Sequence, residues 1–188
     1  MKLLKYKLLF LTIIILSSFS TSEKNITNVE KNVKWMSFEE AVTASKEAKA
    51  NGETPKKIFI DVYTDWCGWC KKMDKNTFEN PKISAYLNEN FYPVKFNAEQ
   101  KENIEFNGRT FKFVDQGRRG YHELAAGLMK GKMSYPTVVF MDEDLNLIQS
   151  IPGYMDVPKF DMIIRYLGED IYENKAWPEY QKEYQATN

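Results

Sequence analysis

Both cysteines of this 188-residue chain lie in one short stretch, residues 64–73, which reads TDWCGWCKKM. Cys67 and Cys70 are two residues apart, and a tryptophan precedes each of them. The stretch follows KIFIDVYT, residues 57–64, whose β-branched and aromatic residues predict a buried strand. The segment after the cysteines, KKMDKNTF, has the residues of a helix. A close cysteine pair between a buried strand and a helix constrains this chain more than any other feature.

This arrangement is typical of a redox centre. Cys67 would lie at the start of the helix, where free backbone N–H groups and the helix dipole favour the thiolate, which is the reactive form. Cys70 would follow on the same face of the first turn and could resolve a mixed disulfide. Gly68 allows the tight turn between them, and Lys71 and Lys72 add positive charge nearby. The pattern therefore favours a pair that exchanges disulfides.

Two other interpretations of the pair stay open at this point. A structural zinc site needs four ligands, whereas the chain offers two cysteines and one histidine, His122, so no metal is expected. A purely structural disulfide is also disfavoured, because so small a loop constrains the unfolded chain little.

Asp61 lies in the middle of the apolar run, between Ile60 and Val62. A buried carboxylate is costly without a partner or a role, and burial raises its pKa toward the range of proton transfer near neutral pH. Six residues before Cys67, it could lie beneath the pair and take the proton of Cys70. The alternative is a solvated position at the end of the strand.

The rest of the chain predicts alternating helices and strands. A capping box, Ser37 to Glu40, starts one helix, and Asn80 followed by Pro81 starts another. The expected elements are a short strand at 33–36, helices at 41–50 and 82–91, a strand at 92–98, a hairpin around Asn107-Gly108, a helix at 121–131, a strand hairpin at 135–154, a helix at 157–168 and a surface helix in the tail. This order predicts an α/β fold with a central mixed sheet flanked by helices.

The N-terminus differs from the rest of the chain. Residues 1–20 combine lysines, a short apolar run and a small-residue end, as in a signal peptide. A polar linker, residues 21–32, and one domain, residues 33–188, follow. We therefore expect a periplasmic or secreted protein, the alternative being an uncleaved N-terminal membrane anchor. The formal net charge of zero gives no indication of a nucleic-acid partner.

The segment IFIDVYTDWCGWCKKM resembles the active-site segment of the thioredoxin superfamily: an apolar strand, an aspartate, an aromatic residue and W-C-G-x-C-K. The resemblance implies a thioredoxin fold in which Cys67 is the nucleophile and Cys70 the resolving residue. It further implies that Asp61 is the buried proton-transfer carboxylate and that Trp66 is the family's preceding tryptophan. No dissociable cofactor is needed, because the Cys67–Cys70 bond stores the electrons.

A second segment, SYPTVVF, resembles the family's cis-proline turn and places it at Pro136, with Tyr135 before it. In the family this turn faces the cysteines, and its backbone pairs with the substrate chain. The chain looks similar to secreted bacterial members with an insertion before the cis-proline, here residues 98–126. A C-terminal helical extension, residues 169–188, is also additional.

The resemblance implies a thiol–disulfide oxidoreductase of the bacterial cell envelope that acts on protein thiols and disulfides and exchanges electrons with a membrane partner. Trp69 replaces the proline or histidine common between the cysteines, so the redox direction is not inherited; the absence of that histidine favours a reductase. Trp66 and Trp69 are expected to form an apolar lip for substrate. The alternatives are a redox-silent binding module of the same fold and a reductase that keeps copper-site cysteines reduced.

Three polar residues of the insertion are expected to be structural. His122, in GYHELA, is expected at a surface position of a short helix rather than beside the thiolate. Arg118 and Arg119, in QGRRG, are expected in a solvated loop rather than in a partner-binding site.

Overall fold

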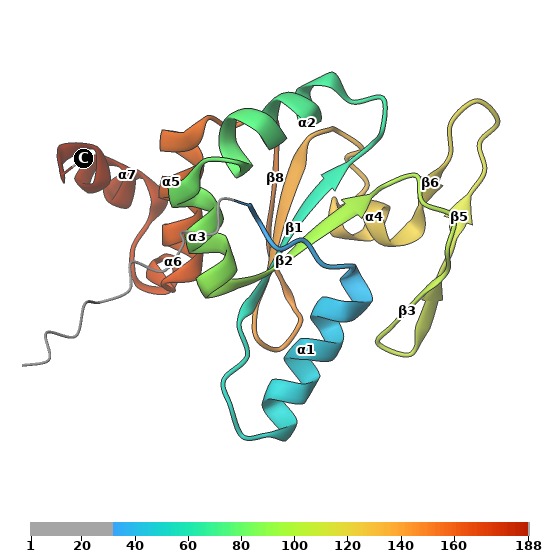
Figure 1. Ribbon diagram of the computed structural model, residues 1–188, viewed down its shortest axis with the longest axis horizontal. Helices are drawn as coiled ribbons and strands as arrows, with labels where there is room; N and C mark the ends of the chain where they lie inside the picture. The colour runs from blue at the N-terminus through green and yellow to red at the C-terminus, as the bar shows by residue number, and fades with distance from the viewer. Residues whose placement is uncertain (1–31, 188) are drawn as a thin grey trace, which may run out of the picture.

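The computed structural model describes residues 32–187 (Figure 1). The expected signal peptide, residues 1–20, and all but the last residue of the expected linker lie outside these residues. The elements follow in the order α1 (Phe38–Ala50), β1 (Lys57–Tyr63), α2 (Gly68–Met73), the π-helical η1 (Asp74–Phe78), α3 (Pro81–Asn90), β2 (Phe91–Asn97), β3 (Ile104–Phe106), β4 (Arg109–Phe111), β5 (Phe113–Val114), β6 (Tyr121–His122), α4 (Glu123–Leu128), β7 (Thr137–Met141), β8 (Leu147–Pro152), α5 (Val157–Gly168), α6 (Ile171–Asn174) and α7 (Trp177–Thr187).

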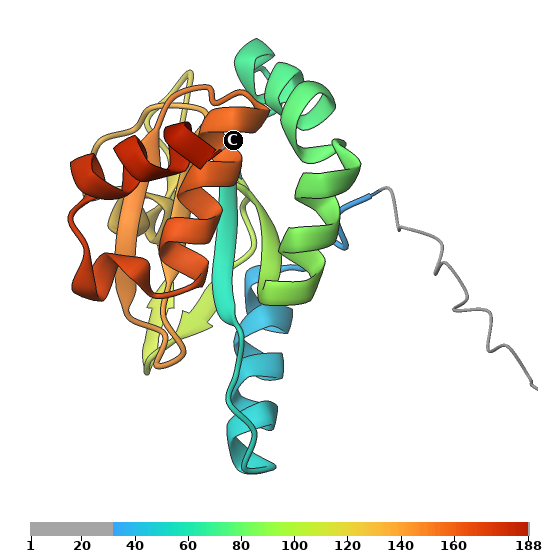
Figure 2. The ribbon, with the colours of Figure 1, turned by 90° about the vertical axis from the view of Figure 1, so that its left-hand side faces the viewer.

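A four-stranded sheet in the order β2-β1-β7-β8 forms the centre of the molecule. Strand β1 is parallel to β2 and antiparallel to β7, and β7 is antiparallel to β8. Helices α3 and α5 lie on one face of this sheet and α1 and α4 on the other (Figures 1 and 2). The predicted central mixed sheet flanked by helices is confirmed.

The alternation of side chains along β1 divides the core into two clusters. Ile58, Ile60 and Val62 pack toward α1 and α4. Phe59 points the opposite way, into a cluster with α3 and α5. Asp61 therefore points to the face of the sheet that α2 and α3 cover, and all residues of β1 except Tyr63 are buried.

Local capping signals set the helix starts as expected. Ser37 and Glu40 form both bonds of the capping box of α1, Asn80 caps α3 ahead of Pro81, and Asp156 caps α5. The expected strand at 33–36 is wrong: this segment makes only an isolated bridge between Met36 and Val94.

The segment between β2 and α4 forms two small ladders at one end of the sheet (Figure 1). The predicted Asn107-Gly108 hairpin is confirmed by the β3–β4 pair, in which both turn residues have positive φ, 50° and 73°. The pairing of β5 with β6 was not predicted, because each strand has only two residues.

After α5 the chain continues into α6 and α7, which pack through aromatic rings. Tyr166 on α5 contacts Tyr172, Trp177 and Tyr180, with ring centroids 5.0 to 6.4 Å apart. Within residues 32–187, no helix combines the length and apolar character that crossing a bilayer requires.

Candidate active site

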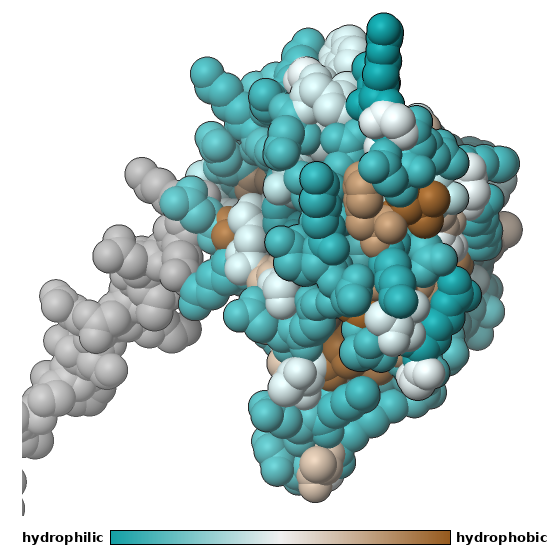
Figure 3. Space-filling model, turned by 90° about the vertical axis from the view of Figure 1, so that its right-hand side faces the viewer, coloured by the Kyte–Doolittle hydropathy of each residue, from teal (hydrophilic) through white to brown (hydrophobic). Residues whose placement is uncertain are grey.

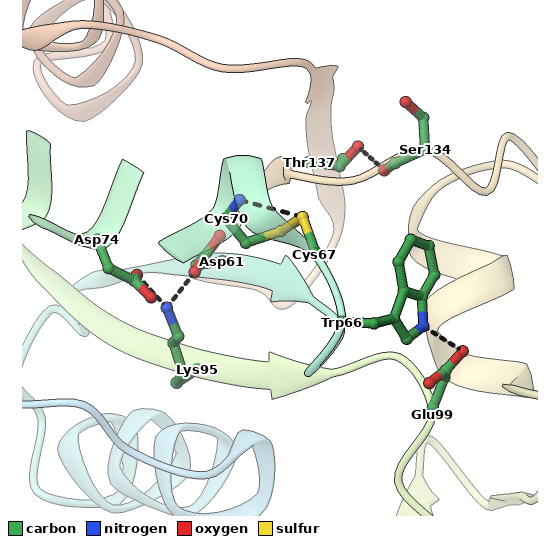
Figure 4. The surroundings of a disulfide bond; sticks show 9 residues. All are labelled: Asp61, Trp66, Cys67, Cys70, Asp74, Lys95, Glu99, Ser134 and Thr137. Atoms are coloured by element: carbon green, nitrogen blue, oxygen red, sulfur yellow. Dashed lines mark hydrogen bonds and ion pairs between the residues drawn. A yellow bond between two sulfur atoms is a disulfide. The ribbon is translucent and has the colours of Figure 1, made fainter. Parts of the chain in front are cut away.

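Cys67 and Cys70 form a disulfide at the start of α2 (Figure 4), with an S–S distance of 2.07 Å. Cys67 is the N-cap of this helix, as expected from the sequence, and its Sγ accepts a hydrogen bond of 3.0 Å from the backbone N–H of Cys70. The Cys67 N–H donates to the carbonyl of Thr64, so a tight turn joins β1 to the helix. In the reduced protein, the same helix start would stabilise a thiolate on Cys67.

The two tryptophans beside the disulfide are exposed, Trp66 by 50% and Trp69 by 57%. Trp66 packs edge-on against Tyr135, with ring centroids 5.9 Å apart. Trp69 packs against Tyr154, and the Lys72 ammonium group lies 4.7 Å from the centre of the Trp69 ring. Both tryptophans are thus at the surface, as an apolar lip requires, while the cysteines are 5% and 2% exposed.

The peptide bond between Tyr135 and Pro136 is cis, which confirms the geometry expected at this position. Pro136 precedes β7, whose first residue, Thr137, pairs with Val62 on the strand that leads to the cysteines. The Thr137 hydroxyl group donates to the Ser134 carbonyl, and Figure 4 shows this turn beside the disulfide. The structure therefore brings the cis-proline turn and the cysteine pair together.

Asp61 is 1% exposed, so the alternative of a solvated strand end is wrong. One of its carboxyl oxygens accepts a hydrogen bond of 2.6 Å from the Lys95 ammonium group, while the other has no partner within the described part of the chain. Burial raises the pKa of Asp61 from 3.8 to about 6, and the attraction of Lys95 opposes this only in part. In Figure 4 the carboxyl group lies between Lys95 and Cys70.

Lys95 and Asp74, both partly buried, complete a charged cluster around Asp61 that the sequence analysis missed. Lys95 on β2 is the register partner of Asp61 on β1, so both side chains leave the sheet on the same face. Its ammonium group also binds the carboxylate of Asp74, which starts η1 seven residues after Cys67. Burial lowers the pKa of Lys95, but the two carboxylates outweigh it, and the pKa is raised.

A sequence signal for this pair does exist. Lys95 interrupts the apolar run YPVKFNA as Asp61 interrupts KIFIDVYT, and two opposite charges in adjacent buried strands are expected to meet.

The expected surface position of His122 is wrong. His122 is fully buried and is the N-cap of α4: its Nδ1 accepts from the Leu124 N–H, and its Nε2 bonds the Glu102 carbonyl. Burial lowers its pKa, so the neutral ring is favoured. Its role in the fold is to connect the loop at Glu102 with the start of α4. Arg118 and Arg119 are exposed, as expected.

Comparison with known proteins agrees with this geometry. A family model described as a thioredoxin-like domain matches residues 43–168. Curated relatives include two proteins named Thiol:disulfide interchange protein DsbD. The one from Cronobacter sakazakii is 26% identical over 115 residues, 60% of this chain and 16% of that protein; the one from Haemophilus influenzae (strain PittEE) is 24% identical over 151 residues, 79% of this chain and 22% of that protein. The chain thus spans a minor part of the length of these relatives.

Solved structures show the same fold. A thioredoxin-fold protein from Helicobacter pylori superposes with a TM-score of 0.52 at 20% identity, over 70% of this chain and 81% of that one. A structure titled DsbH Oxidoreductase superposes with a TM-score of 0.51 at 18% identity, over 73% of this chain and 85% of that one. The predicted thioredoxin fold is confirmed, and the chain belongs to the thioredoxin-like domain family.

Proposed function

We propose that this protein is a thiol–disulfide oxidoreductase that acts on protein disulfides in the bacterial cell envelope and works mainly as a reductase. The observation that carries the proposal is the Cys67–Cys70 disulfide at the start of α2, with Cys67 as the helix N-cap. Membership of the thioredoxin-like family and similarity to thiol:disulfide interchange proteins support this class of chemistry. The envelope location rests on the N-terminal sequence pattern alone.

In the proposed reaction, the Cys67 thiolate attacks one sulfur of a substrate disulfide. The substrate's S–S bond breaks, its second sulfur leaves as a thiolate that takes a proton, and Cys67 is joined to substrate in a mixed disulfide. Cys70 then loses its proton and attacks the Cys67 sulfur. The second substrate thiol leaves, the Cys67–Cys70 bond forms, and two electrons have passed to the substrate without a dissociable cofactor.

Asp61 is the proposed acceptor of the Cys70 proton. A base that works near neutral pH needs a pKa close to that range, and the pKa of about 6 for Asp61 meets this requirement. Its second carboxyl oxygen has no hydrogen-bond partner within residues 32–187 and is free to take the proton. Lys95, held by Asp74 as well, would keep the carboxyl group in position.

Substrate would bind across the exposed Trp66 and Trp69, next to the partly buried Tyr135 and the buried Pro136. The side chains of Trp66 and Tyr135 contact each other, and Trp66 directly precedes Cys67. An extended substrate segment at this edge could pair with the backbone of the cis-proline turn.

Covalent trapping tests the proposal against a redox-silent binding module. In Cys70→Ala, the mixed disulfide on Cys67 cannot be resolved, so we expect partner proteins to be captured covalently and identified by mass spectrometry. The matched control, Cys67→Ala/Cys70→Ala, should capture none. Wild-type protein should also reduce insulin. Absence of captured partners together with failure to reduce insulin would favour the binding module.

Equilibration with a glutathione series tests the direction. A reductase should have a reduction potential of about −270 mV, as thioredoxin has, whereas a reduction potential of about −120 mV would identify an oxidant.

A further inference from the structure

A loop of the insertion, residues 115–120, contacts Trp66, the residue before Cys67. The Arg119 guanidinium group is 4.3 Å from the centre of the Trp66 ring, a cation–π distance. On the same ring, the Nε1–H group of Trp66 donates a hydrogen bond of 2.9 Å to the Glu99 carboxylate. Since Trp66 is the residue before Cys67, Arg119 and Glu99 both contact the side chain that adjoins the reacting cysteine (Figure 4 shows Trp66, Glu99 and Cys67 together).

The sequence of the loop favours this position. Strands β5 and β6 pair on either side of it, and the Asp115 carboxylate accepts from the Gly117 N–H in a local turn. At Gly120 a Cβ atom would lie 2.0 Å from the Phe113 ring and 2.6 Å from the Val114 carbonyl oxygen, so only glycine lets the loop close over Phe113. The loop is therefore built to return past Trp66.

The loop and Trp66 enclose an open groove of about 470 Å³, which we name the Arg118/Arg119 groove. Its positive groups are Lys101, Arg118 and Arg119. Its carboxylates are Glu99 and Asp115, and each already accepts a hydrogen bond, from the Trp66 indole and the Gly117 N–H respectively. The side of the molecule that carries the insertion is mostly hydrophilic, with a few apolar patches (Figure 3).

The two arginines are available to a ligand. Both side chains are exposed, and within residues 32–187 neither forms an ion pair, while the Arg119 guanidinium group stacks on Trp66. By contrast, Arg109 in the same insertion pairs with Glu123, and Arg165 pairs with Asp161. A guanidinium group presents a rigid fork of donors that matches a carboxylate, and two of them beside one groove favour an acidic ligand.

We propose that the Arg118/Arg119 groove binds acidic side chains that lie close to the reacting cysteine of a polypeptide substrate. This inference rests on the proposed disulfide exchange and names the substrate class of that site. A chain bound across Trp66 advances about 3.3 Å per residue, so an aspartate or glutamate a few residues from its cysteine reaches the arginines. The groove thereby selects acidic segments and raises their rate of encounter with Cys67.

Paired peptides test the inference on the reduced full chain. Two peptides carry the same disulfide, one flanked by aspartate and glutamate and the other by asparagine and glutamine, and the readout is the ratio of their second-order rate constants. At low salt we expect the acidic peptide to react about fivefold faster or more, with the ratio falling toward one as salt screens the charges. In Arg118→Glu/Arg119→Glu the ratio should fall below one.

A matched control and two further arms define the outcomes. Arg109→Gln, in the same insertion but outside the groove, should keep the wild-type ratio. A wild-type ratio of one, or a preference that survives the charge reversal, would overturn the acidic subsite while leaving the exchange activity in place. Failure to reduce either peptide would overturn the proposed function and the subsite with it. If the charge reversal slows only the reaction with oxidised glutathione, the groove binds a small disulfide that carries carboxylates. The proposal that it binds polypeptide substrates would then be wrong.

Discussion

At the scale of single residues, the cost of burying Asp61 is the feature with the most consequences. Its pKa is raised from 3.8 to about 6 because burial disfavours the ionised form more than Lys95 favours it. Burial thus gives Asp61 a pKa suited to proton transfer, and it lowers the free energy of unfolding at neutral pH. The opposite case in this protein is Asp161, whose pKa is lowered because Lys82, Tyr184 and Arg165 outweigh its burial.

We predict that Asp61→Asn stabilises the oxidised protein at neutral pH. Because the pKa of Asp61 is raised in the folded state, the contribution of its protonated form to stability is fully present below pH 3.8. This contribution is lost as the pH rises through about 6. Asparagine imitates the protonated form, so the gain at pH 8 should approach about 3 kcal/mol, the equivalent of the pKa shift, and should shrink toward pH 4. Urea unfolding at both pH values measures it.

Asp161→Asn is the matched control, since the same chemical change removes a carboxylate whose pKa is lowered. It should destabilise the protein at pH 8. A loss of stability in Asp61→Asn at pH 8 would show that the bond to Lys95 matters more than the burial. Asp61→Asn should also slow the resolution of mixed disulfides by Cys70, because asparagine cannot accept the Cys70 proton.

At the scale of elements, one buried histidine links three parts of the insertion region: β6, α4 and the loop before β3. His122 ends β6, caps α4 through Nδ1 and reaches the Glu102 carbonyl through Nε2, and its ring packs edge-on against Phe96. The sequence predicted the helix and the hairpin of this region but not this connection. A histidine before ELAAGL has no apolar periodicity to mark it as buried, and its partners lie on other elements.

We predict that His122 makes stability depend on pH below neutrality. Its pKa in the fold is below 6.5, so the unfolded chain takes up a proton that the folded ring does not. This stability is present above pH 6.5 and is lost as pH falls from 6.5 toward the lower pKa of the folded state. His122→Asn keeps a capping oxygen for the Leu124 N–H and should remove the His122 contribution to the pH dependence between pH 7.5 and 5, leaving the opposite contribution of Asp61.

His122→Ala separates the cap from the titration. It lacks both, so at pH 7.5 it should be less stable than His122→Asn by about 1 kcal/mol, the usual value of a cap. Equal stability of the two variants would mean that the cap contributes nothing, and an unchanged pH slope in either would assign the titration to another group. Urea unfolding followed by circular dichroism provides all of these values.

At the scale of the whole molecule, the features that local sequence patterns encode were predicted, whereas the features that depend on which strands pair, and in which register, were missed. The strand before Cys67, the capped helices and the proline turn are each encoded within a few neighbouring residues, and the structure contains them. Lys95 and Asp74 were missed because their role depends on which strands are neighbours and on how Asp61 is aligned with Lys95. The Arg118/Arg119 groove likewise exists only because the insertion returns to Trp66, a contact between residues distant in the sequence.

The C-terminal extension, by contrast, acts through contacts with α5, and its helix α7 lies at the left edge of the molecule in Figure 1. Helix α7 covers α5 through Trp177 and Tyr180, whose ring centroids lie 5.1 and 5.0 Å from that of Tyr166, and Tyr180 is 7% exposed. Burial of these rings contributes to the stability of α5, whereas Trp66 and Trp69 pack against Tyr135 and Tyr154, which lie outside the extension.

We therefore predict that deletion of residues 176–188 lowers the free energy of unfolding by about 3 kcal/mol or more, because it exposes Tyr166 and removes two aromatic contacts. The rate constant for insulin reduction by the folded fraction should stay within about twofold of the wild-type value, since the aromatic contacts that are lost are contacts with α5. Deletion of residues 185–188 alone, which keeps Trp177 and Tyr180, is the control and should leave both quantities unchanged. If the longer deletion slowed exchange tenfold while the protein stayed folded, the extension would have to contact the substrate, and the separation between stability and chemistry argued here would be wrong.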